Sequence, residues 1–241
     1  MRQWKERRVY KHVPKREQTC QTGRRPMHAS APTIYLTRHC TTAWNVEGRL
    51  QGTVDLQLAE VGVREAKAHV SVVRNLAVRR IICSTALRAY QTATVYAESL
   101  RLPLHRTLQL RELDHGEWEG RKAGALLLDR NSGYAQWLSD PACIAIPGGH
   151  ESVQVAQQRA AQAVRDVALS FRGETVLLVA HKHINALLMC KLFKKPFTSF
   201  ESYIVEDTIP HLLAAEAVEA LCCERCLAVE QSDWNPEQGF R

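Results

Sequence analysis

Residues 33–39 read TIYLTRH, a short run of β-branched and apolar residues that ends on an arginine and a histidine. Two further runs have the same character: RIIC at residues 80–83 and TVLLVA at residues 175–180. Short apolar runs of this composition are typical of strands that are buried on both faces of a parallel sheet. The three runs therefore predict the centre of an α/β sheet.

The segments between these runs carry apolar residues at spacings of three and four positions, which is typical of amphipathic helices. Strands that alternate with such helices form βαβ units with right-handed crossovers. We therefore predict an α/β fold with a doubly wound, mostly parallel sheet flanked by helices. The predicted helices cover residues 61–76, 87–100, 152–171 and 184–192, and a last edge strand is expected within residues 204–221.

Polar side chains follow each of the three predicted strands. Arg38 and His39 end the first strand, residues 84–88 follow the second, and His181 follows the third. Ligands of doubly wound sheets bind at the carboxyl ends of the strands. We therefore expect these side chains to meet at one edge of the sheet.

Two arginines and two histidines in one pocket suit phosphoryl transfer. The guanidinium groups of Arg38 and Arg88 are planar and permanently charged, so they can clamp phosphoryl oxygens. A neutral imidazole of His39 can attack phosphorus, while a protonated imidazole of His181 would stabilise the charge of the transition state. The sequence shows neither an Asp/Asn cluster of the kind that holds Mg²⁺ nor a nucleotide-binding glycine loop, so we expect no metal and no cofactor.

The stretch LTRHCTTAWN at residues 36–45 closely resembles the signature of the histidine phosphatase superfamily, whose fold is phosphoglycerate mutase-like. The resemblance extends over nearly all of residues 33–195. Further stretches resemble family motifs in the family order: GRLQGTVDLQL (48–58), AEVGVREA (59–66), STALRAYQTA (84–93), RELDHGEWEG (111–120), PGGHES (147–152) and VAHKHINALL (179–188).

This resemblance implies a metal-independent phosphomonoester hydrolase that acts through a phosphohistidine intermediate. His39 would be the phosphorylated nucleophile, and Glu112 would donate a proton to the leaving alcohol. The implied phosphate ligands are Arg38, Asn45, Arg88 and His181, and we expect Arg49, Gln51, Gly52 and Lys182 to bind the rest of the substrate.

Two branches of the family differ in the loop that carries the acid. The mutases have a Glu-Arg-His-Tyr-Gly type of loop and a longer insertion after it, whereas this chain has ELDHGEWEG at residues 112–120 and a short stretch up to Glu151. This form resembles the phosphatase branch, in which water is the final acceptor. A phosphoglycerate-type mutase and a catalytically weakened member that binds phosphorylated ligands or proteins remain as alternatives.

The chain also departs from the family pattern. Cys40 stands where the family usually has glycine, and it either packs as a plain thiol or has a lowered pKa beside cationic groups. Lys182 and His183 stand where a small residue commonly follows the second histidine, and Lys182 either favours a polyanionic substrate or projects into solvent. We interpret His115, His150 and His183 as solvated or hydrogen-bonded loop histidines.

The net charge of +7 lies entirely in residues 1–32, which hold nine basic and two acidic side chains. Residues 33–241 are neutral, and they give no support to a globular nucleic-acid-binding domain. Residues 1–32 lack apolar periodicity, so we predict a disordered basic extension before a histidine phosphatase domain at residues 33–241. A translation start at Met27, an organelle-targeting peptide and a polyanion-binding arm remain open.

No run of 18 or more apolar residues is present, and the amino terminus lacks the apolar region of a secretory signal. The eight cysteines show no framework spacing, which favours reduced thiols. We therefore expect a cytoplasmic protein with a small phosphorylated metabolite as its partner, and with neither membrane nor nucleic acid bound by the folded domain. The sequence does not predict the oligomeric state.

Overall fold

The computed structural model describes residues 31–226, so the predicted basic extension lies outside the described residues except for residues 31 and 32. A five-stranded sheet forms the centre of the fold, in the order β3-β2-β4-β1-β5. All neighbouring strands are parallel except β5, which runs antiparallel to β1 at the edge. The strands are β1 (Thr33–Arg38), β2 (Arg80–Ser84), β3 (Leu104–Thr107), β4 (Thr175–Ala180) and β5 (His211–Leu212). The predicted fold class is confirmed.

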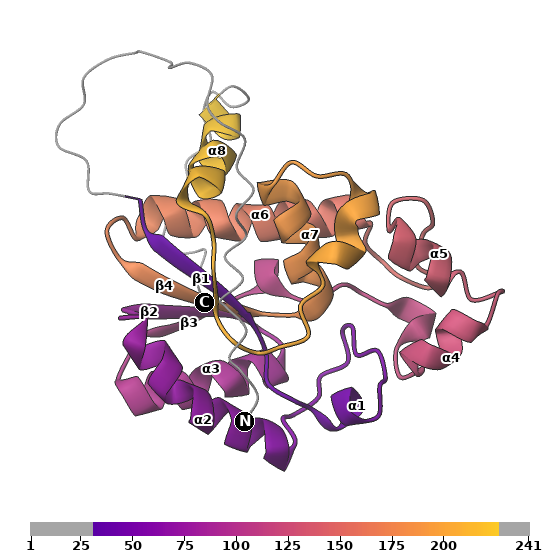
Figure 1. The fold of residues 1–241 in the computed structure, drawn as a ribbon, viewed down its shortest axis with the longest axis horizontal. Helices are drawn as coiled ribbons and strands as arrows, with labels where there is room; N and C mark the ends of the chain where they lie inside the picture. The colour runs from indigo at the N-terminus through magenta and orange to yellow at the C-terminus, as the bar shows by residue number, and fades with distance from the viewer. Residues whose placement is uncertain (1–30, 227–241) are drawn as a thin grey trace, which may run out of the picture.

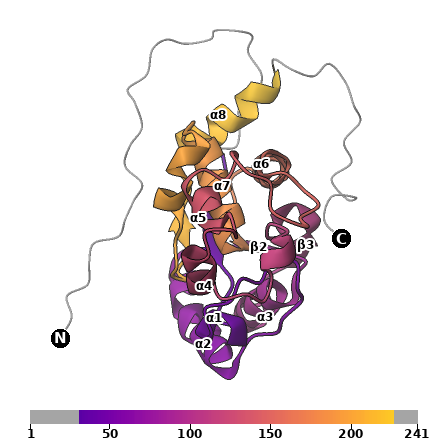
Figure 2. The same cartoon turned by 90° about the vertical axis from the view of Figure 1, so that its right-hand side faces the viewer.

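Helices cover both faces of this sheet (Figure 1). α2 (Glu60–Asn75) and α3 (Leu87–Leu100) lie on one face, and α6 (Val153–Ser170), α7 (Lys182–Leu192) and α8 (Ala215–Cys226) lie on the other, as the turned view of Figure 2 also shows. No helix within residues 31–226 is both long and apolar enough to cross a membrane.

Each face of the sheet has its own hydrophobic core because successive side chains of a strand point to opposite faces. In β4, Leu177 and Val179 pack in the cluster that includes α2 and α3 residues. Their neighbours Val176 and Leu178 pack in the larger cluster that contains residues of α6, α7 and α8. The apolar run of β4 therefore serves both cores, which explains why it lacks alternation.

The strand register brings the carboxyl ends of three strands to one level. Arg38 at the end of β1 pairs with Ala180 at the end of β4, and Val179 pairs with Cys83 of β2. The residues that follow these strands therefore start side by side, as the sequence predicted.

Several short elements were not predicted. They are the strand β3, the helices α1 (Ala43–Val46), α4 (Ala123–Leu128) and α5 (Tyr134–Ser139), and the 3₁₀ turns η1 (Leu108–Leu110), η2 (Gly116–Trp118) and η3 (Phe197–Tyr203). The predicted edge strand within residues 204–221 is reduced to the two residues of β5; an irregular stretch precedes β5, and α8 begins at Ala215.

Candidate active site

A cavity of about 250 Å³ contains nine of the ten predicted site residues in its lining. The exception is His181, which lies directly behind His39 with its ring centroid 5.2 Å away. The predicted residues that line the cavity are Arg38, His39, Asn45, Arg49, Gln51, Gly52, Arg88, Glu112 and Lys182.

The imidazole of His39 is buried and held in a defined orientation. Its Nδ1 lies 2.7 Å from the carbonyl oxygen of Cys40, so Nδ1 carries the proton and donates it. Its Nε2 therefore presents a lone pair, and Nε of Arg88 donates to this atom at 3.2 Å. Burial, together with Arg88 and Arg38, holds the pKa of His39 well below its usual value. His39 is thus a neutral imidazole whose Nε2 is unprotonated and accepts only the hydrogen bond from Arg88, which is the protonation state that a nucleophile requires.

Arg88 is fully buried and supports the loop after α1. Its Nη2 and Nη1 donate to the carbonyl oxygens of Gly52 and Val54, at 2.8 and 2.9 Å. Burial lowers the pKa of Arg88 to about 10, so the guanidinium remains charged at neutral pH. Three of its five N–H groups are bound to His39 and this loop, which leaves two for an anionic ligand.

Gly52 suits this arrangement because its backbone is left-handed and a side chain would meet the Glu119 carboxylate. Its φ is +55°, and an added Cβ would lie 1.9 Å from Oε1 of Glu119. A side chain would displace the Glu119 carboxylate, whose Oε1 accepts the backbone N–H of Thr53 at 2.6 Å. Gly52 therefore serves the site through its backbone conformation and its carbonyl oxygen.

His181 caps the start of α7 with its backbone, and its Nε2 lies 2.8 Å from Oγ of Ser84. Its Nδ1 is buried and has no hydrogen-bond partner among the described residues. Burial and the nearby Arg88 hold the pKa of His181 well below its usual value. In the protein alone an imidazolium at His181 would lie beside Arg88 with no anion to balance it, so the predicted protonated form of His181 requires a bound phosphoryl group.

Glu112 is fixed by the amino terminus of α7. Its Oε1 accepts the backbone N–H of Ile184 at 2.9 Å, and its Oε2 accepts that of His183 at 3.1 Å. These bonds satisfy N–H groups that a helix leaves free in its first turn. The carboxyl group is buried yet contributes to the cavity lining. A side chain from the acid loop is thereby held at the same cavity as His39.

Asn45 and Arg49 line the cavity, and local contacts fix the position of both side chains. The side-chain oxygen of Asn45 accepts hydrogen bonds from the backbone and hydroxyl of Thr42, which starts α1. This leaves the Nδ2 amide of Asn45 as a donor without a partner among residues 31–226. Arg49 pairs with Glu47 and donates to the carbonyl oxygen of Gly120 at 2.8 Å. It therefore links the loop after α1 to the loop of residues 112–120, which carries Glu112.

The profile of the histidine phosphatase superfamily (branch 1) matches residues 34–214, which is most of the chain and all of this site. The chain is a member of the histidine phosphatase superfamily. Among curated relatives, the adenosylcobalamin/alpha-ribazole phosphatase of Salmonella typhimurium is 29% identical over 72% of this chain and 86% of its own. The probable phosphoglycerate mutase GpmB of Yersinia pestis is 32% identical over 68% of this chain and 75% of its own.

Solved structures of this superfamily have the same fold. A mycobacterial glucosyl-3-phosphoglycerate phosphatase, solved in complex with VO3, is 30% identical and has a TM-score of 0.65 over 71% of this chain and 87% of its own. Bacillus stearothermophilus YhfR is 32% identical, with a TM-score of 0.66 over 71% of this chain and 85% of its own. Phosphatases and mutase-like proteins are therefore both among the relatives.

Glu206, which is not among the predicted site residues, contacts two cationic side chains of the site. Glu206 accepts a hydrogen bond from Nη1 of Arg38 at 3.1 Å through its carboxylate, and it also pairs with Nζ of Lys182. All three side chains line the cavity. Lys182 therefore does not project freely into solvent, and a phosphate that binds Arg38 must share this arginine with Glu206 or displace it. No motif around Glu206 distinguishes it in the sequence.

Cys40 packs into the core instead of facing the phosphate site. Its side chain is fully buried in the cluster with α2 and α3, with Sγ 3.8 Å from the hydroxyl of Tyr96. Burial raises the pKa of Cys40 to about 11, so the hypothesis of a lowered thiol pKa is wrong. The Cys40 amide donates to Oγ1 of Thr92 at 2.9 Å. The cysteine therefore replaces the usual glycine without narrowing the cavity, because Cys40 is absent from its lining.

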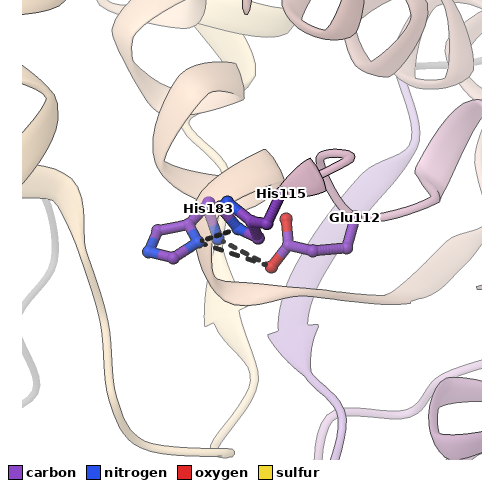
Figure 3. Close-up of side chains that lie close together, drawn as sticks. All are labelled: Glu112, His115 and His183. Atoms are coloured by element: carbon purple, nitrogen blue, oxygen red, sulfur yellow. Dashed lines mark hydrogen bonds and ion pairs between the residues drawn. The ribbon is translucent and has the colours of Figure 1, made fainter. Parts of the chain in front are cut away.

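His115 and His183 are buried and hydrogen-bonded to each other, so the hydrogen-bonded alternative of their interpretation is met and the solvated alternative is wrong. His183 also belongs to α7 and not to a loop. Nε2 of His115 lies 2.8 Å from Nδ1 of His183, and the Glu112 carboxylate lies beside this pair (Figure 3). Trp137 packs edge-on against both rings, with centroid distances of 5.6 and 5.5 Å. The three side chains Glu112, His115 and His183 are a group of the described residues that could hold a metal ion. His150, by contrast, is exposed and pairs with Asp114.

Acid is expected to destabilise this protein through its buried histidines. Burial is the main cause that lowers the pKa values of His39, His115, His181 and His183. The unfolded chain binds protons at these positions near pH 6.5, which is about the ordinary histidine pKa, while the folded chain does not. The free energy of unfolding therefore decreases as the pH falls below about 6.5.

We expect the thermal unfolding midpoint to fall between pH 7 and pH 5, and to fall less in inorganic phosphate, because a bound anion favours protonated histidines. Calorimetry at matched ionic strength, with chloride in place of phosphate, provides the comparison. A midpoint that stays constant over this range would contradict the burial of four neutral imidazoles.

Proposed function

We propose that this protein is a metal-independent phosphomonoester hydrolase that forms a phosphohistidine at His39 and uses Glu112 as its proton donor. The observation that carries this proposal is the fixed tautomer of His39. Its Nδ1–H is bound to the Cys40 carbonyl oxygen, so the lone pair of Nε2 is available beside the guanidinium of Arg88.

In the first half of the reaction, Nε2 of His39 attacks phosphorus and the bond from phosphorus to the ester oxygen breaks. Glu112 gives its proton to this oxygen, so the product leaves as a neutral alcohol. Arg88 and Arg38 bind the phosphoryl oxygens, and Arg38 exchanges its contact with Glu206 for one with the phosphate. The Nε2 atom of His39 must leave its hydrogen bond with Arg88 before it attacks.

In the second half, the Glu112 carboxylate takes a proton from a water molecule, and the oxygen of this water attacks the phosphohistidine. The bond from phosphorus to Nε2 breaks, inorganic phosphate forms, and both His39 and Glu112 return to their starting states. A phosphate dianion in the pocket also favours a proton on His181, whose Nδ1 is buried without a partner among the described residues.

The size and charge of the cavity favour a small substrate. Its volume of about 250 Å³ is slightly below the roughly 300–1,000 Å³ of typical small-molecule sites. The cationic side chains of Arg38, Arg49 and Lys182 line the cavity together with the buried His39 and Arg88. We therefore propose a small phosphorylated metabolite as the substrate, with any large leaving group extending outside the cavity.

Release of inorganic phosphate in the presence of EDTA tests this function. We expect the full chain to hydrolyse a panel of small phosphomonoesters in EDTA at rates that Mg²⁺ does not increase, because arginine and histidine side chains balance the phosphoryl charge. The His39→Ala variant, purified in parallel, controls for contaminating phosphatases. Activity that EDTA abolishes and Mg²⁺ restores would contradict the proposed mechanism.

A mutase is the second candidate, because a relative with 32% identity is named as a probable phosphoglycerate mutase. The two candidates differ in the final acceptor of the phosphoryl group, which is water in the hydrolase and a second substrate hydroxyl in the mutase. Incubation with 3-phosphoglycerate and a bisphosphoglycerate primer separates them. We expect that any reaction of 3-phosphoglycerate releases inorganic phosphate and forms no isomer. Formation of the isomer in excess of phosphate release would identify a mutase.

A further inference from the structure

The buried pair of His115 and His183 is not used by the mechanism above. His115 precedes η2, and His183 is the second residue of α7. Figure 3 shows both rings next to the Glu112 carboxylate. One ligand atom from each of these three side chains lies within 4.8 Å of the other two. Two imidazole nitrogens and one carboxylate oxygen are a donor set that binds Zn²⁺ in proteins.

Hydrogen bonding alone leaves this pair incompletely satisfied. The facing nitrogens of the two rings bind each other at 2.8 Å, while Nδ1 of His115 and Nε2 of His183 are buried without a partner among the described residues. A buried polar atom without a partner is uncommon in proteins. The two rings therefore lie together for a reason other than complete hydrogen bonding between them.

An ion can reach these atoms from the active-site cavity. Glu112, His115 and His183 all contribute to the lining of the cavity that contains His39. Behind the two rings the aromatic side chains of Trp137 and Phe200 close the site. The open direction is therefore the direction from which the substrate enters.

Metal binding requires both rings to move, because Nδ1 of His183 lies 2.8 Å from Nε2 of His115 but 3.9 Å from Oε2 of Glu112. Two nitrogens that each lie about 2.0–2.1 Å from a tetrahedral zinc ion are about 3.3 Å apart. The present distance of 2.8 Å must therefore increase by about half an ångström as the hydrogen bond between the rings is replaced by the metal. Glu112 stays in place, because the backbone N–H groups of His183 and Ile184 hold its carboxylate.

We propose that Glu112, His115 and His183 form an inhibitory site for a divalent transition-metal ion of the Zn²⁺ type. A carboxylate that binds the ion cannot carry the proton that the leaving alcohol needs, so hydrolysis stops. The outer nitrogens of both histidines lack hydrogen-bond partners among the described residues, a feature that typically weakens metal sites by about 10- to 100-fold. The ion is therefore a reversible inhibitor. The inhibition of hydrolysis by this ion rests on the proposed function, whereas the binding of the ion to the three side chains does not.

Two measurements on the full chain, first freed of metal, test the site. Competition with a chromogenic chelator measures Zn²⁺ binding, and phosphate release measures inhibition. His115→Phe keeps an aromatic ring against Trp137 but removes one ligand, and His183→Asn serves as a second variant if the first does not fold. His150→Ala removes an exposed histidine from the neighbouring loop and is the matched control. None of these variants changes a cysteine, so any Zn²⁺ that the cysteines bind contributes equally to the binding curves of wild type and variants.

We expect wild type and His150→Ala to bind one more Zn²⁺ ion than His115→Phe and to lose activity as this ion binds. Inhibition of His115→Phe should need at least about tenfold more Zn²⁺. Identical binding curves for wild type, His115→Phe and His183→Asn would overturn the site whether or not the protein is a phosphatase. Binding that depends on His115 without loss of activity would overturn the inhibition.

Discussion

Replacement of His39 by alanine is expected to lower kcat for phosphomonoester hydrolysis by on the order of 10⁴-fold or more. The substitution removes the Nε2 atom that would form the bond to phosphorus. The nearest imidazole, His181, cannot take over this role in its present position, because it is absent from the cavity lining and its Nε2 bonds with Ser84. Steady-state kinetics with a phosphomonoester, at saturating substrate, measures the loss.

Two controls accompany this variant. Thermal unfolding shows whether it folds, since the substitution leaves Nε of the buried Arg88 without its partner. His150→Ala removes an exposed imidazole outside the site and should retain activity within about twofold. A folded His39→Ala protein that keeps more than about a tenth of the wild-type kcat would rule out His39 as the nucleophile.

Replacement of Glu112 by glutamine is expected to have an effect that depends on the leaving group. An alkoxide is a poor leaving group without a proton, so kcat for alkyl phosphates should fall by about 10²- to 10⁴-fold. A nitrophenolate leaves without protonation, so transfer from nitrophenyl phosphate to His39 should be much less affected. Pre-steady-state release of nitrophenol and steady-state hydrolysis of an alkyl phosphate provide the two rates.

Glu117→Gln is the matched control for this comparison, because Glu117 is an exposed residue of the same loop. In Glu112→Gln the new side-chain amide would face backbone N–H groups of α7, so thermal unfolding must be measured for this variant as well. An equal loss for both leaving groups in a folded variant would show that Glu112 positions other groups and does not donate the proton.

The central sheet could be predicted because its three middle strands are apolar on both faces. β1, β2 and β4 lie in the order β2-β4-β1, and helices cover both sides. The side chains after these strands could be placed together for the same reason, since parallel strands bring their carboxyl ends to one edge. β3 escaped prediction because its four residues, LHRT, are mostly polar and only Thr107 is buried.

The state of the histidines depends on contacts that no local pattern contains. His115 and His183 are 68 positions apart; Trp137 of α5 packs against both rings, and Phe200 of η3 packs against His183. The sequence left solvated and hydrogen-bonded loop histidines as alternatives, and only the structure shows that the two rings bond to each other. Likewise, the neutral form of His181 follows from its burial beside Arg88, which residue order does not reveal.

Glu206 escaped prediction for a related reason. It belongs to the irregular stretch between η3 and β5, and its neighbours match no functional motif. Only the tertiary structure brings its carboxylate to Arg38, which is 168 positions away in the chain. Sequence reasoning thus selected residues that the fold brings to one cavity, but it missed the Glu206 carboxylate, which contacts Arg38 and Lys182 there.

The most direct test of the account is to trap the phosphoenzyme in the Glu112→Gln variant with radiolabelled nitrophenyl phosphate. This substrate needs no acid for the first step, whereas the second step needs Glu112 as a base, so the intermediate should accumulate. We predict a label that approaches one per chain, that is stable in base and labile in acid, and that mass spectrometry locates on His39. Continued hydrolysis without a trapped label, or a label on another residue, would contradict the account.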